Sequence, residues 1–315
     1  MPLLKLVPDN TNIGFLKWRW VAVALTGVLT IASVVLLVTR GLNYGVDFAG
    51  GLMIEVGFEQ AADIDALRAN VNSRGVGEGS IQEFGGPNVV SIRLPLPKSE
   101  DEAAVQQVVD KVQRGISAAY PDASFRRVET VSGKVSGELI RDGALAAVLA
   151  MLGVALYIWL RFEWQFGVGA LVSLVHDVLV TLGFFALTQL EFNLNIVAAI
   201  LTIIGYSLND TIVNYDRIRE NLKKYRKMEM LPLLDLSINE MLARTVMTSL
   251  TMALALGALL IWGGDVLFGF TAAMLLGIFI GTYSSIYVAG PLLYWTGVGP
   301  NTFVPQENSG AERTA

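Results

Sequence analysis

Long stretches of the chain contain almost no charged residues, and each is long enough to cross a lipid bilayer. About 20 apolar residues, rising about 1.5 Å each, span a hydrocarbon core of about 30 Å. Six such stretches occur, at residues 20–38, 143–160, 166–190, 194–215, 245–264 and 266–299. The pattern predicts six transmembrane helices, with the last stretch long enough for either one kinked span or two short ones.

Between the first two stretches, the segment from Asn43 to about Asp142 has an ordinary mixture of polar and apolar residues. Residues 52–58 alternate in the manner of a strand. Short strand candidates follow at 81–84 and 89–94, with turn-forming residues between them, and 125–131 is the last expected strand. Residues 63–71 and 102–119 carry apolar residues at helical spacing, with Ser99 as a candidate N-cap of the second helix. The order β-α-β-β-α-β is the ferredoxin-like arrangement. We therefore expect an α-helical polytopic membrane protein with one external ferredoxin-like α+β domain.

Lysine and arginine residues gather on one side of the predicted spans. Lys5, Lys17 and Arg19 precede the first span, and six basic residues lie between Arg217 and Lys227. By the positive-inside rule these segments are cytoplasmic, and six spans place both termini there. The expected organisation is a cytoplasmic N-terminus (1–17), a first transmembrane helix (18–40), the external domain (41–138), five further helices with a basic cytoplasmic loop at 216–240 (139–299), and a disordered cytoplasmic tail (300–315).

Composition narrows the functional classes. Hydrophobic residues make up 53% of the chain and charged residues 16%, whereas a soluble domain usually has about 25% charged residues. A net charge of −5 argues against a nucleic-acid partner. The absence of cysteine and the single histidine exclude thiolate and multi-histidine metal sites, so no metal site is expected.

Polar residues inside three of the spans recur at helical spacing, which places each set on one helix face. The sets are Ser173, His176, Asp177 and Thr181; Ser207, Asp210, Thr211 and Asn214, with Asn209 beside them; and Arg244, Thr248 and Thr251. A charged side chain at the bilayer centre costs roughly 2.5–3.5 kcal/mol on insertion scales. We therefore expect the three faces to turn toward one another. The hydroxyls could simply join neighbouring helices, and His176 could be a packing residue or part of a proton relay.

Depth along the helices indicates which charges can meet. Measured from the ends of the basic loop that joins their spans, Asp210 lies about 9 Å and Arg244 about 6 Å into the membrane. The two side chains are therefore expected to form a pair. Asp177 lies deeper, about 21 Å along its span from Glu163, and is a candidate proton carrier.

Several motifs resemble the SecF branch of the SecD/SecF family of protein-export membrane proteins, which belongs to the resistance–nodulation–division superfamily. They are NYGVDFAGG (43–51), VSGKVSGELIRDGALA (131–146), SLVHDVLVTLGFF (173–185), SLNDTIVNYDRIREN (207–221) and RTVMTSLT (244–251). They occur in the family's order, and the resemblance as a whole runs from about Gly41 to Trp295.

The resemblance implies a subunit that works with SecD, the SecYEG channel and YajC to help move unfolded exported polypeptides across the bacterial inner membrane. It implies protons as the coupling ion and no other cofactor, with Asp210 and Arg244 on the proton path. Asp47, Gly50 and Gly51 match a motif that is either a hinge to the external domain or a tight turn before its first strand. We expect no enzymatic activity. The alternatives are a proton-coupled small-molecule efflux subunit and a passive assembly factor of the channel.

Overall fold

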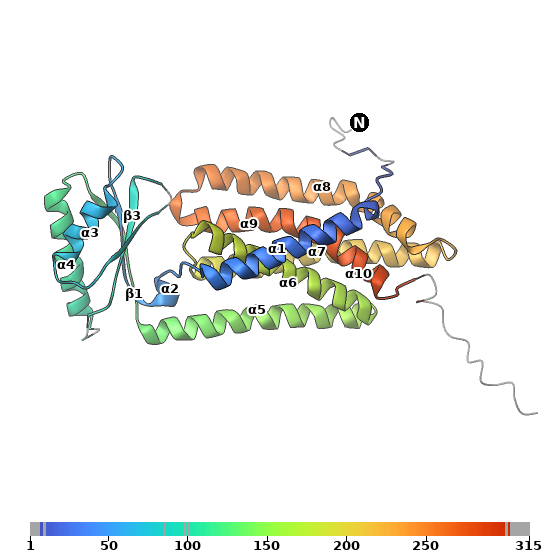
Figure 1. The fold of residues 1–315 in the computed structure, drawn as a ribbon, viewed down its shortest axis with the longest axis horizontal. Helices are drawn as coiled ribbons and strands as arrows, with labels where there is room; N and C mark the ends of the chain where they lie inside the picture. The colour runs from blue at the N-terminus through green and yellow to red at the C-terminus, as the bar shows by residue number, and fades with distance from the viewer. Residues whose placement is uncertain are drawn as a thin grey trace, which may run out of the picture.

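A computed structural model of the chain describes residues 7–8, 11–84, 86–97, 99, 101–299 and 302. Six long helices lie side by side, and a small α/β domain sits at one end of the bundle (Figure 1). The predicted fold class is confirmed. Residues 7–8 and 11–17 of the N-terminal segment (1–17) are described, whereas the expectation for the tail (300–315) lies outside the described residues except at residue 302. The cytoplasmic placement of the N-terminal segment stays a prediction.

The long helices follow the uncharged stretches of the sequence. They are α1 (Arg19–Thr39), preceded by the 3-10 turn η1 (Leu16–Trp18), α5 (Gly133–Arg161), α6 (Trp164–Thr188), α7 (Leu194–Lys224), α8 (Met230–Trp262) and α9 (Asp265–Ser284). The sixth span continues from α9 through a π-helical segment, η2 (Ser285–Ala289), into α10 (Gly290–Trp295). The last uncharged stretch therefore forms one irregular span and not two.

Three of these helices extend beyond the apolar stretches that predicted them. α5 begins at Gly133, α7 runs to Lys224 and α8 begins at Met230. Within the segment 216–240, only residues 225–229 are therefore outside a helix. Hydropathy identifies only the part of a helix that lies in the hydrocarbon core of a bilayer. The helix itself can continue beyond that part, where its charged side chains reach water.

The α/β domain is built from β1 (Gly51–Gly57), α3 (Ile64–Asn72), β2 (Ser80–Glu83), β3 (Val89–Leu94), α4 (Glu102–Ala119) and β4 (Ser124–Val131). All strand pairs are antiparallel in the order β2-β3-β1-β4, which is the ferredoxin-like topology. Helices α3 and α4 cover one face of the sheet, and the short helix α2 (Val46–Ala49) lies between the domain and the bundle (Figure 1). The N-cap of α4 is Asp101, which accepts a hydrogen bond from Ala104 N at 2.7 Å, and not Ser99.

The π-helical segment η2 lies directly before Gly290 and Pro291. Proline has no N–H, so the carbonyl of Tyr287, four residues earlier, loses its usual α-helical partner. We attribute the wider π turn to this loss. Such segments often mark functional sites in helices.

Helix α9 approaches α7 closely because two glycines face it. A Cβ on Gly277 would lie 2.4 Å from Ile203 Cγ1, and one on Gly281 would lie 2.9 Å from Ser207 Cβ. Small residues four positions apart commonly allow membrane helices to approach in this way. The contact brings the end of α9 next to the polar face of α7.

Substituting alanine for Gly281 should therefore push α9 away from α7. We expect the free energy of unfolding in detergent to fall by roughly 1–3 kcal/mol, as for other overpacked cores. Gly257→Ala is the matched control, because no atom lies within 4 Å of a Cβ at that helical position. An equal effect of both substitutions on the unfolding midpoint would contradict this account of the contact.

The glycine pair before β1 is held in a defined conformation. Gly50 has φ 69° and Gly51 has φ 120°, and a Cβ on Gly51 would lie 2.8 Å from Leu94 O. Residues with side chains rarely adopt such angles. The pair thus forms a tight entry to the sheet, while its role as a hinge stays a prediction.

Gly51→Ala should destabilise the α/β domain, because the new methyl group meets both an unfavourable φ and the backbone of β3. We expect a loss of roughly 1–3 kcal/mol in the free energy of unfolding. Gly86→Ala serves as the control, since a Cβ there has no neighbour within 4 Å. Amide hydrogen exchange of the sheet would measure the difference, and unchanged protection in Gly51→Ala would refute it.

Candidate functional site

Two buried carboxylates lie in the middle of the helical bundle. The first, Asp177 on α6, is only 1% exposed. Its Oδ2 atom accepts hydrogen bonds from Ser207 Oγ on α7 at 2.5 Å and from Ser284 Oγ on α9 at 2.9 Å. Three helices therefore converge on this one carboxylate.

His176 lies next to Asp177 on the same helix. Its Nδ1 atom is 3.1 Å from Asp177 Oδ1, so a hydrogen on Nδ1 would make this contact a hydrogen bond to the carboxylate. His176 Nε2 is buried and has no hydrogen-bond partner within the described part of the chain. The imidazole is thus oriented by Asp177, and a place for His176 in a proton relay stays a prediction.

The second carboxylate is Asp210 on α7, which is 8% exposed. Its Oδ1 atom accepts a hydrogen bond from Thr245 Oγ1 on α8, and its Oδ2 atom accepts one from Ser285 Oγ, both at 2.9 Å. Both oxygens are held by neutral hydroxyl donors.

Consecutive serines connect the two carboxylates. Ser284 is the last residue of α9 and Ser285 is the first residue of η2, so the change of helix type occurs between them. Each hydroxyl also lies within hydrogen-bonding distance of a carbonyl of its own helix, at 3.2 Å from Gly281 O and 3.0 Å from Thr282 O respectively. A serine hydroxyl has one hydrogen to donate. Each serine can therefore donate either to its carboxylate or to its own helix.

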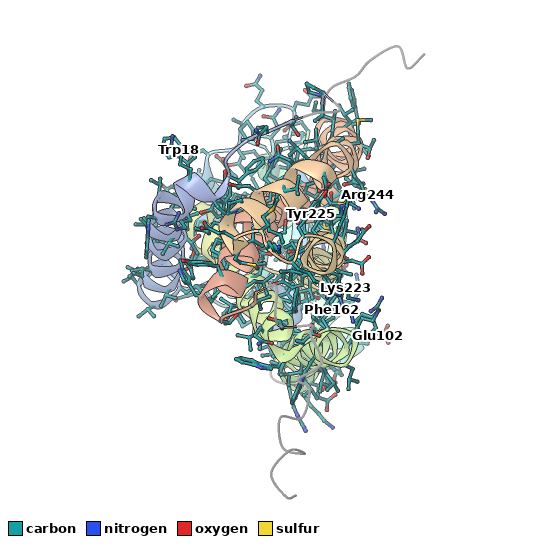
Figure 2. The ribbon with its side chains drawn as sticks, turned by 90° about the vertical axis from the view of Figure 1, so that its right-hand side faces the viewer. Trp18, Glu102, Phe162, Lys223, Tyr225 and Arg244 are labelled. Atoms are coloured by element: carbon teal, nitrogen blue, oxygen red, sulfur yellow. The ribbon has the colours of Figure 1, made fainter. Side chains whose placement is uncertain are left out.

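No salt bridge or hydrogen bond joins Asp210 to Arg244, although the two charges are near enough to interact electrostatically. Arg244 has an exposed side chain and makes no ion pair or side-chain hydrogen bond in the part of the chain described. It lines a groove of about 420 Å³ between α5, α7 and α8 and lies at the rim of the bundle (Figure 2). Arg244 and Thr245 are neighbours and point about 100° apart around the helix axis. Arg244 lies at the expected depth along α8, close to that of Asp210 on α7. The side chain that points toward Asp210, however, is that of Thr245.

The other residues of the polar stripes divide between the buried site and the surface. Ser173 and Asn214 are buried, each with a polar atom that lacks a partner among the described residues. Thr181 and Thr211 are buried and donate to backbone carbonyls of their own helices. Asn209, Thr248 and Thr251 are exposed, and they lie outside the cluster.

Sequence reasoning did not select Thr245, Ser284 or Ser285. The adjacent serines belong to a run of hydroxyl-bearing residues, Thr282 to Ser285, within an uncharged stretch, which is a signal that could have been used. Thr245 directly follows Arg244, and only the packed structure distinguishes the two. No group of three or more His, Cys, Asp or Glu side chains in the described ranges is placed to hold a metal ion.

Asp47, from the motif before β1, lies outside this cluster, at the start of α7. Its Oδ2 atom accepts a hydrogen bond at 2.9 Å from the backbone N–H of Leu194, the first residue of α7. Helix N-termini leave N–H groups without intrahelical partners and favour negative charge. Asp47 therefore caps the helix that carries Asp210.

Two family models match the chain. One, described as protein export membrane protein SecD/SecF, C-terminal, matches residues 111–298, and the SecD/SecF GG motif matches residues 35–62. A protein translocase subunit SecF from Rhodobacter capsulatus is 45% identical over 95% of this chain and 93% of its own length. Another from Vibrio alginolyticus is 40% identical over 98% of both chains.

Solved structures agree with the sequence relatives. A SecDF crystal structure, of a translocon-associated membrane protein from a Thermus species, matches 94% of this chain with a TM-score of 0.84 and 34% identity. A second SecDF structure, in a super-membrane-facing form, matches 93% with a TM-score of 0.69 and 34% identity. This chain corresponds to 40% of the length of either SecDF chain. The chain is therefore a multi-pass membrane protein that belongs to the SecD/SecF family of protein export membrane proteins.

Proposed function

We propose that this chain acts with a SecD-type partner in protein export, and that protons moving through the bundle drive the external domain. The observation that carries the proposal is the pair of buried carboxylates, Asp177 and Asp210, held by hydroxyl donors on consecutive residues of one helix. Protons are the coupling ion in this proposal, and no other cofactor takes part.

The hydroxyl network explains how a proton could change the packing of the helices. An ionised carboxylate attracts hydroxyl hydrogens strongly, because charge-assisted hydrogen bonds are the stronger kind. When Asp210 takes up a proton, that attraction weakens, and Ser285 can donate to Thr282 O instead. The contact between α7 and the start of η2 then loosens. Protonation of Asp177 would act on Ser284 in the same way.

The energy available from the gradient is sufficient for such a switch. One charge crossing 100 mV releases about 2.3 kcal/mol. This changes a two-state equilibrium by roughly fiftyfold. Motion of the helices, and not a chemical reaction, is the proposed output.

The exposed face of α8 is the proposed contact with the partner. Arg244, Thr248 and Thr251 share this face, and an exposed arginine within a membrane span would be costly in lipid. The SecDF relatives contain more than half of their length outside the part that matches this chain. We infer that a SecD-type partner covers this face and there brings Arg244 into the proton path. The SecYEG channel, YajC and an unfolded exported polypeptide are the further proposed partners.

The proposed orientation places both termini in the cytoplasm and the α/β domain in the periplasm. The basic residues between Arg217 and Lys227 support it, because this segment joins α7 and α8 at the end of the bundle opposite the domain (Figures 1 and 2). Basic segments of this kind are retained in the cytoplasm.

Asp210→Asn should abolish the part of export that depends on the proton gradient while leaving assembly with the partner intact. The amide can still hydrogen-bond with Ser285 and Thr245, but it cannot exchange a proton. Export into membrane vesicles, with the gradient present or collapsed, measures the effect. Asp216→Asn is the matched control, because this exposed residue lies six positions further along α7. Unchanged gradient dependence in Asp210→Asn would favour a passive assembly factor, and export of a drug-sized solute would favour an efflux subunit.

A further inference from the structure

A buried ion pair joins the α/β domain to the connection between α6 and α7. Arg93 Nη2, on β3, lies 2.9 Å from Glu191 Oε2, and the two side chains are only 15% and 9% exposed. The other terminal nitrogen of Arg93 donates to Asn43 Oδ1 at 3.1 Å and to Tyr44 O at 2.6 Å. Arg93 therefore binds both the connection between α6 and α7 and the segment that leads into the α/β domain.

Backbone contacts beside this pair make the junction continuous with α7. Phe192 N donates to Asn43 O at 2.8 Å, and Gly45 N donates to Phe192 O at 2.9 Å. Asp47 caps α7 at Leu194 N. Because α7 carries Asp210, a displacement of this helix would be passed directly to the domain.

Gly45 shows how tightly the carboxylate is enclosed. A Cβ on this residue would lie 2.5 Å from Glu191 Oε1. The carboxylate thus packs against bare backbone, and its charge is poorly hydrated.

Burial raises the pKa of Glu191 above its ordinary value, and the Arg93 guanidinium acts in the opposite direction but is outweighed. Glu129 on β4 and Asp47 on α2 add further upward contributions. Glu83 on β2 lines the same cavity, which has a volume of about 160 Å³ and a lining rich in polar side chains. A polar cavity of this size can admit water. Water in this cavity would bring protons to Glu191, which is one of its lining residues.

We propose that Arg93 and Glu191 are positioning residues that dock the external domain on the outer end of α7. Glu191 takes up a proton when the domain docks, and the resulting neutral carboxyl group still accepts the hydrogen bond from Arg93 Nη2 through its carbonyl oxygen. The inference rests on the proposed function for its role in export. We call this contact the Arg93–Glu191 latch.

The direction of the pH effect follows from linkage. In an undocked domain Glu191 would be hydrated and would have its ordinary pKa, whereas in the docked domain its pKa is raised. Protons therefore bind more tightly to the docked form. Acid on the domain side favours docking, and docking weakens as the pH rises through the raised pKa. A high proton concentration outside thus favours the docked position.

A distance measurement in the full chain tests the latch. The native sequence has no cysteine, so Thr39→Cys at the end of α1 and Ser73→Cys after α3 can carry two spin labels at exposed sites. The labelled chain is placed in lipid vesicles with its SecD-type partner, and the label separation is measured against pH. We expect a second, undocked separation to gain population as the pH rises, about tenfold for each unit by which docking raises the pKa.

Variants of Glu191 and of Arg93 test the contribution of each residue to the latch. Glu191→Gln cannot ionise and should show the docked separation at every pH, whereas Glu102→Gln on α4 should behave as the native chain does. Arg93→Met should increase the undocked population at high pH, and Arg93→Lys should restore much of the docking. A separation that does not change with pH in the native chain, or an unaltered pH response in Glu191→Gln, would overturn the latch.

The same labelled chain with Asp210→Asn distinguishes the latch from the proposed function. A pH-dependent separation together with lost gradient-dependent export supports both. If gradient-dependent export is retained and the separation still depends on pH, the proposed function fails and the latch stands.

Discussion

A negative charge buried among membrane helices must be satisfied by donors that the protein itself supplies. Here the donors are hydroxyls, and those of Ser284 and Ser285 serve two different carboxylates from one short piece of backbone. Much of the bundle is arranged around this requirement. The change from α9 to the π-helical η2 occurs between the two serines, and Pro291 provides a reason for the irregular turn.

Close packing of the helices makes these hydrogen bonds possible. Gly277 and Gly281 let α9 approach α7, so that Ser207 and Ser284 reach the same oxygen of Asp177. A hydroxyl is short, and a helix displaced by even one methyl group would leave the carboxylate without its donor. The glycines and the hydrogen bonds are therefore two aspects of one contact. Such a contact has few intermediate arrangements, because packed interiors resist continuous deformation.

The external domain is connected to this region by more than a flexible linker. The segment from Asn43 to Asp47 forms backbone hydrogen bonds with Phe192 and caps α7, and Arg93 binds both this segment and Glu191. The glycines Gly50 and Gly51 follow directly and hold the entry to β1 in a tight turn. The carboxylate cluster and the domain thus share α7 as a common element.

Local properties of the sequence were enough to predict six spans, the ferredoxin-like order of the domain and the two carboxylates that the membrane encloses. Hydropathy and periodicity are carried by neighbouring residues, so they can be recognised without the fold. The partners of those carboxylates could not be recognised in this way. Arg244 and Thr245 differ by one position, and only the rotation of α8 against α7 decided that Thr245 reaches Asp210. Arg93 and Glu191 are 98 positions apart, and the docking of the domain brings them together. Helix rotation and domain docking depend on the packing of many side chains from distant segments, and only the tertiary structure decides them.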